Sequence, residues 1–284
     1  MITSLSNQKI KQIIALRDKP RIRNDSGLFI AEGVRMFEEA PPEQIREICV
    51  SQPTWEQMES GDKYPLIWKK LLLCRERDIT LEQVSEEVFR KASDTQTPQG
   101  ILFVMEQAAY SLPEAVARAG RRQRQGGRPA LFLVLEDIQD PGNLGTILRT
   151  GEGAGVDGVI MNRGTVDIYN PKTIRSTMGS LFRVPFFRVE RPEEAIALLR
   201  RERIRICAAH LEAERYYDEI SYGEGSAFLI GNEGNGLRRE TAMEADLLLK
   251  IPMEGRLESL NAAVAAALLM YQAAGEYRRS GEFC

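Results

Sequence analysis

The chain has 284 residues, of which 43% are hydrophobic and 28% are charged, so it has room for two soluble globular domains. No run is long and apolar enough to span a bilayer, and the N-terminus lacks the charged-then-apolar pattern of an export signal, which favours a cytoplasmic protein. The formal net charge of −3 argues against a broad basic surface for nucleic acid, although a local patch is sufficient for phosphate contacts.

Cysteine and histidine usage argues against a metal site. The four cysteines are widely scattered without a CxxC pair, and His210 is the single histidine, so the usual zinc-ligand spacings are absent. We therefore expect no bound metal. The cysteines are expected to be free thiols in a reducing compartment, with Cys284 exposed. His210 lies at the edge of a predicted strand and is expected to have a structural role.

The N-terminal part alternates helical and strand patterns. Residues 5–19 have the apolar spacing of a helix with lysines on its opposite face, and residues 28–31 have the pattern of a short strand. A helical pattern over 34–40 is ended by two prolines, and strand patterns follow at 47–51 and 101–105. This alternation predicts a small α/β domain over residues 1–106.

Residues 107–129 are predicted to link two domains. A helical pattern there is followed, at 120–127, by a stretch of Gly, Arg and Gln that is typical of a linker. Basic residues cluster here and near the N-terminus. Such a cluster is usually a solvated face, and the alternative is a patch that contacts phosphates. The two clusters comprise Arg118, Arg121, Arg122, Arg124 and Arg128, and Lys9, Lys11, Arg17, Lys19, Arg21 and Arg23.

The pattern changes from residue 130 onward. Residues 131–135 form a continuous apolar run, which is typical of a strand buried on both faces. Strands and helices then alternate, which predicts an α/β domain over 130–284 with a mainly parallel sheet and helices on both faces. Ligands of such sheets bind beyond the carboxyl ends of the strands. No GxGxxG follows the first strand, which disfavours a dinucleotide oxidoreductase and a Rossmann-type methyltransferase.

Three polar segments follow predicted strands of this domain, at residues 140–149, 231–237 and 251–261. In the first segment, Asn143 either caps the helix that follows or faces a ligand. Arg149 either points into a pocket or forms a surface ion pair with Glu152.

The second and third segments leave similar alternatives. The glycines of 231–236 either allow the backbone to approach a ligand closely or form an ordinary flexible loop, and Glu233 among them favours a functional role. Ser259 and Asn261 precede a long Ala-rich helix, where they cap the helix, contact a ligand, or do both.

Together, the three segments resemble the three signature motifs of the SpoU (TrmH-type) RNA 2′-O-ribose methyltransferases of the SPOUT superfamily, in the order that the family has. The resemblance implies that S-adenosylmethionine is the methyl donor and that Arg149 is the residue most closely associated with catalysis. The implied catalytic set is Arg149, Asn143, Glu233, Ser259 and Asn261. The implied cofactor-binding set is Gly231, Asn232, Gly236, Ile251 and Leu260.

The resemblance also implies features that periodicity does not reveal. These are a deep trefoil knot that forms the cofactor pocket, and a homodimer with the active site close to the subunit interface. In the implied reaction, a ribose 2′-hydroxyl attacks the sulfonium methyl of S-adenosylmethionine. A guanidinium is a poor general base, so we assign Arg149 to orienting the hydroxyl and the adjacent phosphate and leave the proton acceptor unassigned.

Residues 6–11, 29–35 and 97–100 resemble the substrate-binding domain found in many family members, which is similar to the small α/β/α fold of kink-turn-binding ribosomal proteins. We hypothesise that basic residues of this domain hold folded RNA. Lys172 and Arg175 share a helix face, which either grips phosphates or is simply exposed. The predicted RNA-binding set is Lys9, Lys11, Arg21, Arg23, Arg35, Lys172 and Arg175.

Ribosomal RNA of the large-subunit (23S) type is the favoured substrate, because this domain architecture mostly serves that RNA in the family. The alternatives are a tRNA 2′-O-methyltransferase, a non-catalytic RNA-binding or ribosome-assembly factor on the same fold, and a methyltransferase that modifies a base nitrogen or confers antibiotic resistance.

Overall fold

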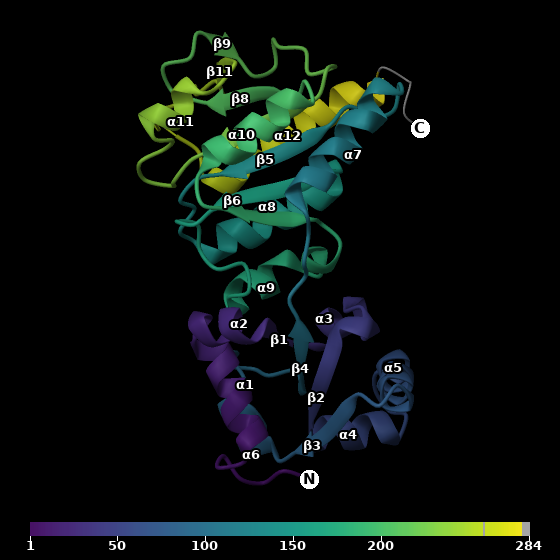
Figure 1. Cartoon of the computed structure of the whole chain (residues 1–284). Coiled ribbons are helices and arrows are strands. Elements are labelled where there is room, and N and C mark those ends of the chain that lie inside the picture. Colours follow the sequence, from purple (N-terminus) through teal and green to yellow (C-terminus); the bar gives the residue numbers. More distant parts are fainter. Residues whose placement is uncertain (258, 280–284) are drawn as a thin grey trace. The chain divides into compact units, whose positions relative to one another are not determined.

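A computed structural model describes residues 1–257 and 259–279, which form two compact units (Figure 1). Unit 1 comprises Met1–Ala108 and Asp167–Phe182, and unit 2 comprises Ala109–Val166 and the chain from Arg183 onward. The chain therefore leaves unit 2 after Val166 and returns to it at Arg183. The sequence predicts one continuous domain over 130–284, whereas in the structure residues 167–182 pack with unit 1.

Unit 1 is built on a four-stranded mixed sheet in the order β1-β4-β2-β3. β4 runs antiparallel to β1 and β2, while β2 and β3 are parallel. The strands are β1 (Leu28–Glu32), β2 (Ile45–Ser51), β3 (Thr80–Val84) and β4 (Ile101–Glu106). The helices are α1 (Gln8–Asp18), α2 (Pro20–Ser26), α3 (Val34–Glu39), η1 (Pro42–Gln44), α4 (Gln52–Glu59), α5 (Pro65–Glu76), α6 (Glu86–Ala92), α9 (Pro171–Thr177) and η2 (Ser180–Phe182).

Helices cover both faces of this sheet because its central strand is apolar at successive positions. On one face, Leu102 and Val104 of β4 belong to a buried cluster with residues of α1 and α6. On the other face, the ring of Phe103 packs edge-on against Phe37 of α3, with ring centroids 5.3 Å apart. The residues of β4 alternate between two helical layers, so the strand is buried along nearly its whole length.

The returning segment with α9 completes unit 1. The ring of Tyr169 lies 4.5 Å from that of Phe29 in β1, and its hydroxyl accepts a hydrogen bond from the Ala108 N–H at 2.9 Å. Asp167 accepts hydrogen bonds from the buried guanidinium of Arg23, at 2.9 and 2.6 Å. These contacts join residues that are far apart in the sequence, so a local sequence pattern does not predict them.

Unit 2 contains a seven-stranded sheet in the order β7-β6-β5-β10-β8-β11-β9, and every neighbouring pair of strands is parallel. The predicted α/β fold with a mainly parallel sheet is confirmed. The strands are β5 (Leu131–Leu135), β6 (Gly158–Asn162), β7 (Phe186–Val189), β8 (Arg205–Ala209), β9 (Arg215–Tyr216), β10 (Ser226–Ile230) and β11 (Leu247–Lys250). Every residue of β5, β6 and β10 is buried, as expected for strands between two helical layers.

Helices lie on both faces of this sheet (Figure 1). One face carries α7 (Leu112–Arg124) and α10 (Pro192–Arg201), whose apolar residues share a core cluster with Phe132 and Val134. α8 (Pro141–Ala154) and α12 (Ala262–Arg279) pack against each other, and α12 also contacts β5 and β10. The short α11 (Arg239–Met243) precedes β11.

The predicted linker is mostly helical in the structure. Leu112, Ala115, Val116 and Ala119 have the spacing of one helix face and are buried against unit 2. Two arginines in the last turn of α7 form ion pairs: Arg122 contacts Asp157 at 2.6 Å, and Arg124 contacts Glu202 at 2.5 Å. The sequence predicts a helical pattern here and a linker stretch at 120–127, and in the structure the helix continues to Arg124.

Within residues 1–257 and 259–279, no helix is long and apolar enough to cross a membrane. Cys49, Cys74 and Cys207 are buried free thiols. Burial raises the pKa of the Cys49 and Cys207 thiols to about 12, so both stay protonated and unreactive at neutral pH. Cys284, which we expected to be exposed, lies outside the described residues.

Candidate active site

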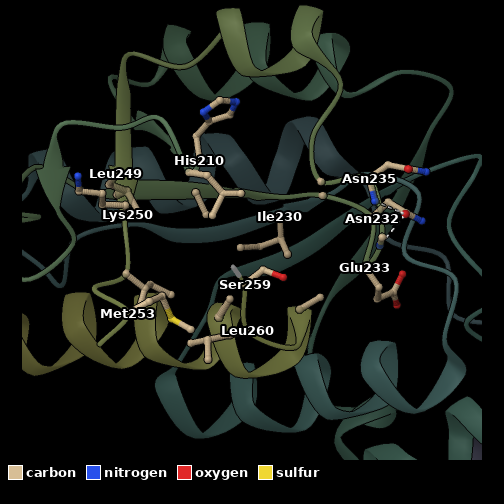
Figure 2. Close-up of a pocket in the computed structure, with 18 residues that line it drawn as sticks. His210, Ile230, Asn232, Glu233, Asn235, Leu249, Lys250, Met253, Ser259 and Leu260 are labelled. Carbon is tan, nitrogen blue, oxygen red and sulfur yellow. Dashed lines mark hydrogen bonds between the residues drawn. The ribbon is translucent and has the colours of Figure 1, made fainter. Parts of the chain in front are cut away.

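A cavity of about 280 Å³ lies beyond the carboxyl ends of β8, β10 and β11 in unit 2, which is where a parallel sheet is expected to bind ligands (Figure 2). Apolar side chains form much of its wall, and peptide groups of the 231–236 loop form another part. Its size and mixed lining suit a small organic molecule.

All five predicted cofactor-binding residues line this cavity. Gly231, Asn232 and Gly236 come from the loop after β10, Ile251 follows β11, and Leu260 precedes α12. The fold therefore brings two separate sequence segments to one cavity. Leu211, Lys250 and Met253 also line it, and sequence analysis missed them. Their positions could have indicated this role, because Leu211 comes just after β8, Lys250 ends β11 and Met253 follows it.

The loop after β10 is a rigid turn in which Gly231 has no room for a side chain. A Cβ at this position would lie 2.2 Å from the carbonyl carbon of Gly236 and 2.2 Å from the amide nitrogen of Leu237. Asn232 and Gly236 exchange two backbone hydrogen bonds, of 3.0 and 2.9 Å. The Asn232 side chain also accepts hydrogen bonds from the N–H groups of Gly234 and Asn235. These hydrogen bonds give the loop a defined turn, which supports the alternative that its glycines allow the backbone to approach a ligand closely.

Glu233 ties this loop to the start of α8. Its carboxylate accepts hydrogen bonds from the N–H groups of Gln139 and Asp140, both at 3.0 Å, and from Nδ2 of Asn143 at 2.9 Å. Burial by itself would raise the pKa of Glu233, but the hydrogen bonds from Asn143 and the backbone offset this effect and hold its pKa below the usual value. Glu233 is therefore an ionised anchor at neutral pH.

Asn143 and Asn261 extend this network to the third motif. The Oδ1 atom of Asn143 accepts a hydrogen bond of 2.9 Å from Nδ2 of Asn261. The Oδ1 atom of Asn261 accepts hydrogen bonds from the N–H groups of Ala263 and Val264 at the start of α12. Asn261 therefore caps its helix, as one of the two alternatives predicts, and also links it to α8. Ser259 is exposed and lines the cavity.

Arg149 projects from α8 as an exposed side chain and is not part of the cavity lining. Glu152, its alternative partner, forms an ion pair with Arg183. Within the described part of the chain, the Arg149 guanidinium has no hydrogen-bond or ion-pair partner. Its donors are therefore available for a ligand or another chain.

His210 lines the cavity, although we expected only a structural role. Its Nδ1 atom accepts a hydrogen bond of 3.3 Å from the Glu212 N–H. Figure 2 shows its ring extending away from Ile230 and Ser259. Among the residues that the structure describes, no group of three or more His, Cys, Asp or Glu side chains could hold a metal ion.

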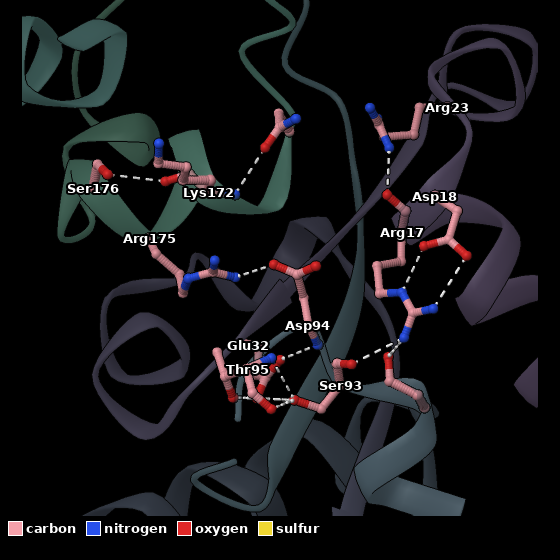
Figure 3. Close-up of polar contacts among 12 residues, drawn as sticks. Arg17, Asp18, Arg23, Glu32, Ser93, Asp94, Thr95, Lys172, Arg175 and Ser176 are labelled. Atoms are coloured by element: carbon pink, nitrogen blue, oxygen red, sulfur yellow. Dashed lines mark hydrogen bonds and ion pairs between the residues drawn. The ribbon is translucent and has the colours of Figure 1, made fainter. Parts of the chain in front are cut away.

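The predicted RNA-binding residues of unit 1 differ in their availability. Lys11, Arg21, Arg35 and Lys172 are exposed. Lys9 is held by carboxylates, with Nζ 2.5 Å from Glu82 and 3.6 Å from Glu47. Arg175 contacts Asp94 at 2.6 Å, as Figure 3 shows. Ion pairs at the surface compete with phosphate, so Lys9 and Arg175 must exchange a carboxylate partner before they bind RNA, as must Arg21, which lies 3.4 Å from Asp25.

Arg23 requires a correction. Its side chain is only 2% exposed, and its guanidinium donates to the carbonyl oxygens of Leu16 and Arg17 as well as to Asp167. A buried guanidinium with these partners holds unit 1 together and is not available to RNA. The sequence shows Arg23 within a basic cluster, and the acidic partner is 144 residues away.

Comparisons with known proteins agree with this geometry. The model of the SpoU rRNA Methylase family matches residues 130–271, and that of the MRM3-like substrate binding domain matches residues 7–102. The 23S rRNA (guanosine(2553)-2′-O)-methyltransferase RlmP of Bacillus subtilis (strain 168) is 34% identical over 276 residues, covering 96% of this chain and 99% of its own length. The chain therefore belongs to the SpoU rRNA methylase family.

Two solved structures resemble the whole chain. An AdoMet-bound rRNA methyltransferase from Sinorhizobium meliloti superimposes with a TM-score of 0.80 at 30% identity, covering 98% of this chain and 97% of that one. The SpoU methyltransferase AviRb from Streptomyces viridochromogenes, in complex with AdoMet, has a TM-score of 0.79 at 26% identity and covers 97% of this chain and all of that one.

Proposed function

We propose that the protein transfers a methyl group from S-adenosylmethionine to a ribose 2′-hydroxyl of large-subunit ribosomal RNA. The observation that carries this proposal is the hydrogen-bonded chain from Glu233 through Asn143 to Asn261, beside a cavity lined by the second and third motifs. The family and the near full-length likeness to a 23S rRNA 2′-O-methyltransferase support the same function.

The cavity residues fit S-adenosylmethionine. Ile230, Leu249 and Leu260 provide apolar surface for a flat base, and the tight turn that begins at Gly231 presents peptide groups to polar atoms. We propose Gly231, Asn232, Gly236, Ile251 and Leu260 as the cofactor-binding residues. When bound, S-adenosylmethionine supplies a methyl group that its sulfonium centre activates for attack.

We propose that the protein contributes mainly positioning to the reaction. Arg149 offers five donors in a fixed plane, which suits the 2′-hydroxyl and the neighbouring phosphate. Asn143, Glu233, Ser259 and Asn261 hold the adjoining motifs in place around the reacting groups. Because the donor is already activated, alignment of the hydroxyl accounts for much of the rate. The group that accepts the proton is not assigned.

We propose that residues 1–106 bind RNA and that residues 130–284 form the methyltransferase domain with a trefoil knot. Exposed basic residues of unit 1, namely Lys11, Arg21, Arg35 and Lys172, are proposed to contact RNA phosphates, with Lys9 and Arg175 contributing after exchange of their carboxylate partners. A ribosomal substrate implies a location in the cytoplasm.

We also propose that the protein is a homodimer through unit 2. Val264 and Tyr271 on α12 are 49% and 45% exposed, and their spacing of seven residues places them on one helix face. Arg149 lies outside the cavity lining and has no hydrogen-bond or ion-pair partner among the described residues, which supports an active site that a second copy completes.

The decisive experiment measures transfer of labelled methyl from S-adenosylmethionine to unmodified ribosomal RNA and, in parallel, to transfer RNA, followed by nucleoside analysis. We expect a 2′-O-methylated nucleoside from 23S rRNA, and the guanosine in the name of the Bacillus subtilis relative is the first position to map. A product only in transfer RNA, or a methylated base, would replace the proposed substrate or reaction. Absence of cofactor binding would favour a non-catalytic RNA-binding factor.

A further inference from the structure

Glu136, the residue that follows β5, belongs to none of the residue sets predicted from the sequence. Its side chain is 1% exposed, and its carboxylate has three donors on the segment that begins α11. Oε2 accepts from the Arg238 N–H at 2.8 Å, and Oε1 accepts from Nε of Arg238 at 2.7 Å and from Oγ1 of Thr241 at 2.5 Å. A buried carboxylate is costly unless it is bonded in this way, so these contacts are strongly favoured in the folded state.

These bonds fix the far end of the 231–237 loop that lines the cavity. The near end follows β10, and the N–H of Glu136 donates to the carbonyl oxygen of Ile230 at 2.9 Å. Glu136 therefore contacts the chain on both sides of the loop. Its backbone bonds to Ile230 before the loop, and its side chain bonds to Arg238 after the loop. Glu136 therefore bridges the two ends of the loop, in addition to the backbone hydrogen bonds between Asn232 and Gly236.

The next residue, Asp137, provides a second attachment. Its carbonyl oxygen accepts a hydrogen bond of 2.8 Å from Nδ2 of Asn232 inside the loop. Asp137 has a positive φ of 56°, and its backbone and side chain both bond to Asn162, at 2.9 and 2.8 Å. This unfavourable conformation is maintained by its surroundings and directs the carbonyl to Asn232.

We infer that Glu136 is a positioning residue for cofactor binding, because its carboxylate holds the loop after β10 in the conformation that forms the cavity wall. The inference rests on the proposed function, in which this loop contacts S-adenosylmethionine. It concerns a residue outside the proposed cavity lining, which acts through Arg238 and Thr241. When the loop loses this attachment, a smaller fraction of molecules has the binding-competent cavity, and the apparent affinity falls by that fraction.

The test compares full-length Glu136→Gln with Val116→Ala, a control that reduces packing in α7 far along the chain from the loop. Two quantities are measured: hydrogen–deuterium exchange of residues 231–238 without cofactor, and the Kd for S-adenosylmethionine by calorimetry. For Glu136→Gln we expect faster exchange in the loop and a Kd raised about 10- to 100-fold. For Val116→Ala we expect a lower Tm with both quantities unchanged.

Thr241→Val removes one of the three hydrogen bonds to the Glu136 carboxylate and keeps the volume of the side chain. This variant tests the inference if Glu136→Gln does not fold. Its expected increase in Kd is about 2- to 10-fold. Unchanged loop exchange and a Kd within twofold of the parent in the folded variant would overturn the inference, as would equal losses in Val116→Ala. A parent protein that binds no S-adenosylmethionine would refute the proposed function instead, and the exchange data would still decide whether Glu136 holds the loop.

Discussion

Side chains with two roles explain much of the candidate site. Asn261 caps α12 with its oxygen and donates to Asn143 with its nitrogen, so one amide serves both helix stability and the polar network. An isolated capping interaction uses only the acceptor. The hydrogen bond that its amide nitrogen donates to Asn143 distinguishes Asn261 from a simple cap. This bond can form only because the starts of α8 and α12 lie close together.

Arg149 is the residue on which the proposed chemistry depends most. We expect Arg149→Ala to lower kcat by at least about 100-fold, since a charge-assisted contact made in the transition state contributes roughly 3 kcal/mol. The Kd for S-adenosylmethionine should stay within about twofold of the parent, because Arg149 does not line the cavity. Single-turnover methyl transfer and calorimetry measure the two quantities. Near-normal turnover by this variant would remove Arg149 from the mechanism.

Glu233 should give the protein a pH-dependent stability. Its pKa is lower in the folded than in the unfolded chain, so its contribution is fully present above the unfolded value, about 4.3, and is lost as pH falls through the folded value. Urea unfolding of the parent and of Glu233→Gln should therefore differ by a constant amount from neutral pH to about pH 5 and by less at lower pH. Glu214→Gln, an exposed substitution, serves as the control. A difference that grows on acidification would contradict the assignment.

At the scale of elements, the site is a junction between two strand-to-helix connections. The 136–140 segment after β5 and the 231–238 segment after β10 belong to adjacent parallel strands, and each supplies a glutamate to the other. Glu233 bonds to the start of α8, and Glu136 bonds to the start of α11. The hydrogen bonds of these two glutamates tie the two connections to each other, although neither connection has regular secondary structure.

The glycines of the 231–236 loop provide a prediction with an internal control. Gly231→Ala should weaken S-adenosylmethionine binding at least about 30-fold, because a Cβ would overlap the Gly236 and Leu237 backbone and force the turn open. Gly234→Ala should bind normally, since its nearest neighbour would be the Asn232 side-chain oxygen at 3.6 Å. Calorimetry on both variants tests this difference. Equal affinities would show that the turn does not shape the site.

At the scale of the whole molecule, the two units are not two continuous stretches of sequence. Asp167–Phe182 lies between β6 and β7 of unit 2 in the chain but packs in unit 1. The buried guanidinium of Arg23 contacts Asp167 at 2.6 Å and links this segment to the N-terminal part of unit 1. Unit 1 therefore requires residues that a cut after residue 106 would remove.

Arg23→Met should destabilise the protein by about 3 to 5 kcal/mol, the usual cost of removing one member of a buried ion pair. Arg21→Met, in the same helix, should change stability by less than about 1 kcal/mol, because Arg21 is 90% exposed and its ion pair with Asp25, at 3.4 Å, lies at the surface. Urea unfolding of the full chain measures both effects. If the two variants were equally stable, Arg23 would not have the structural role assigned to it.

The sequence by itself predicted the parallel sheet of unit 2, the three polar segments at its strand ends and the family that they resemble. These features depend on local composition: apolar runs of strand length, turn residues after them and a motif order that the chain displays directly. The cap of α12 at Asn261 was also readable, because capping uses residues adjacent in the sequence. The capping alternative for Asn143 was wrong, because Asp140 caps α8 and accepts a hydrogen bond from the Asn143 N–H.

Only the tertiary structure decided which residues are partners. The buried position of Arg23, the packing of residues 167–182 in unit 1 and the partners of Glu136 all depend on contacts between distant parts of the chain. A charge has the same appearance in the sequence whether it is solvated, paired or buried. Burial and pairing determine its free energy, and they are set only when the chain has folded.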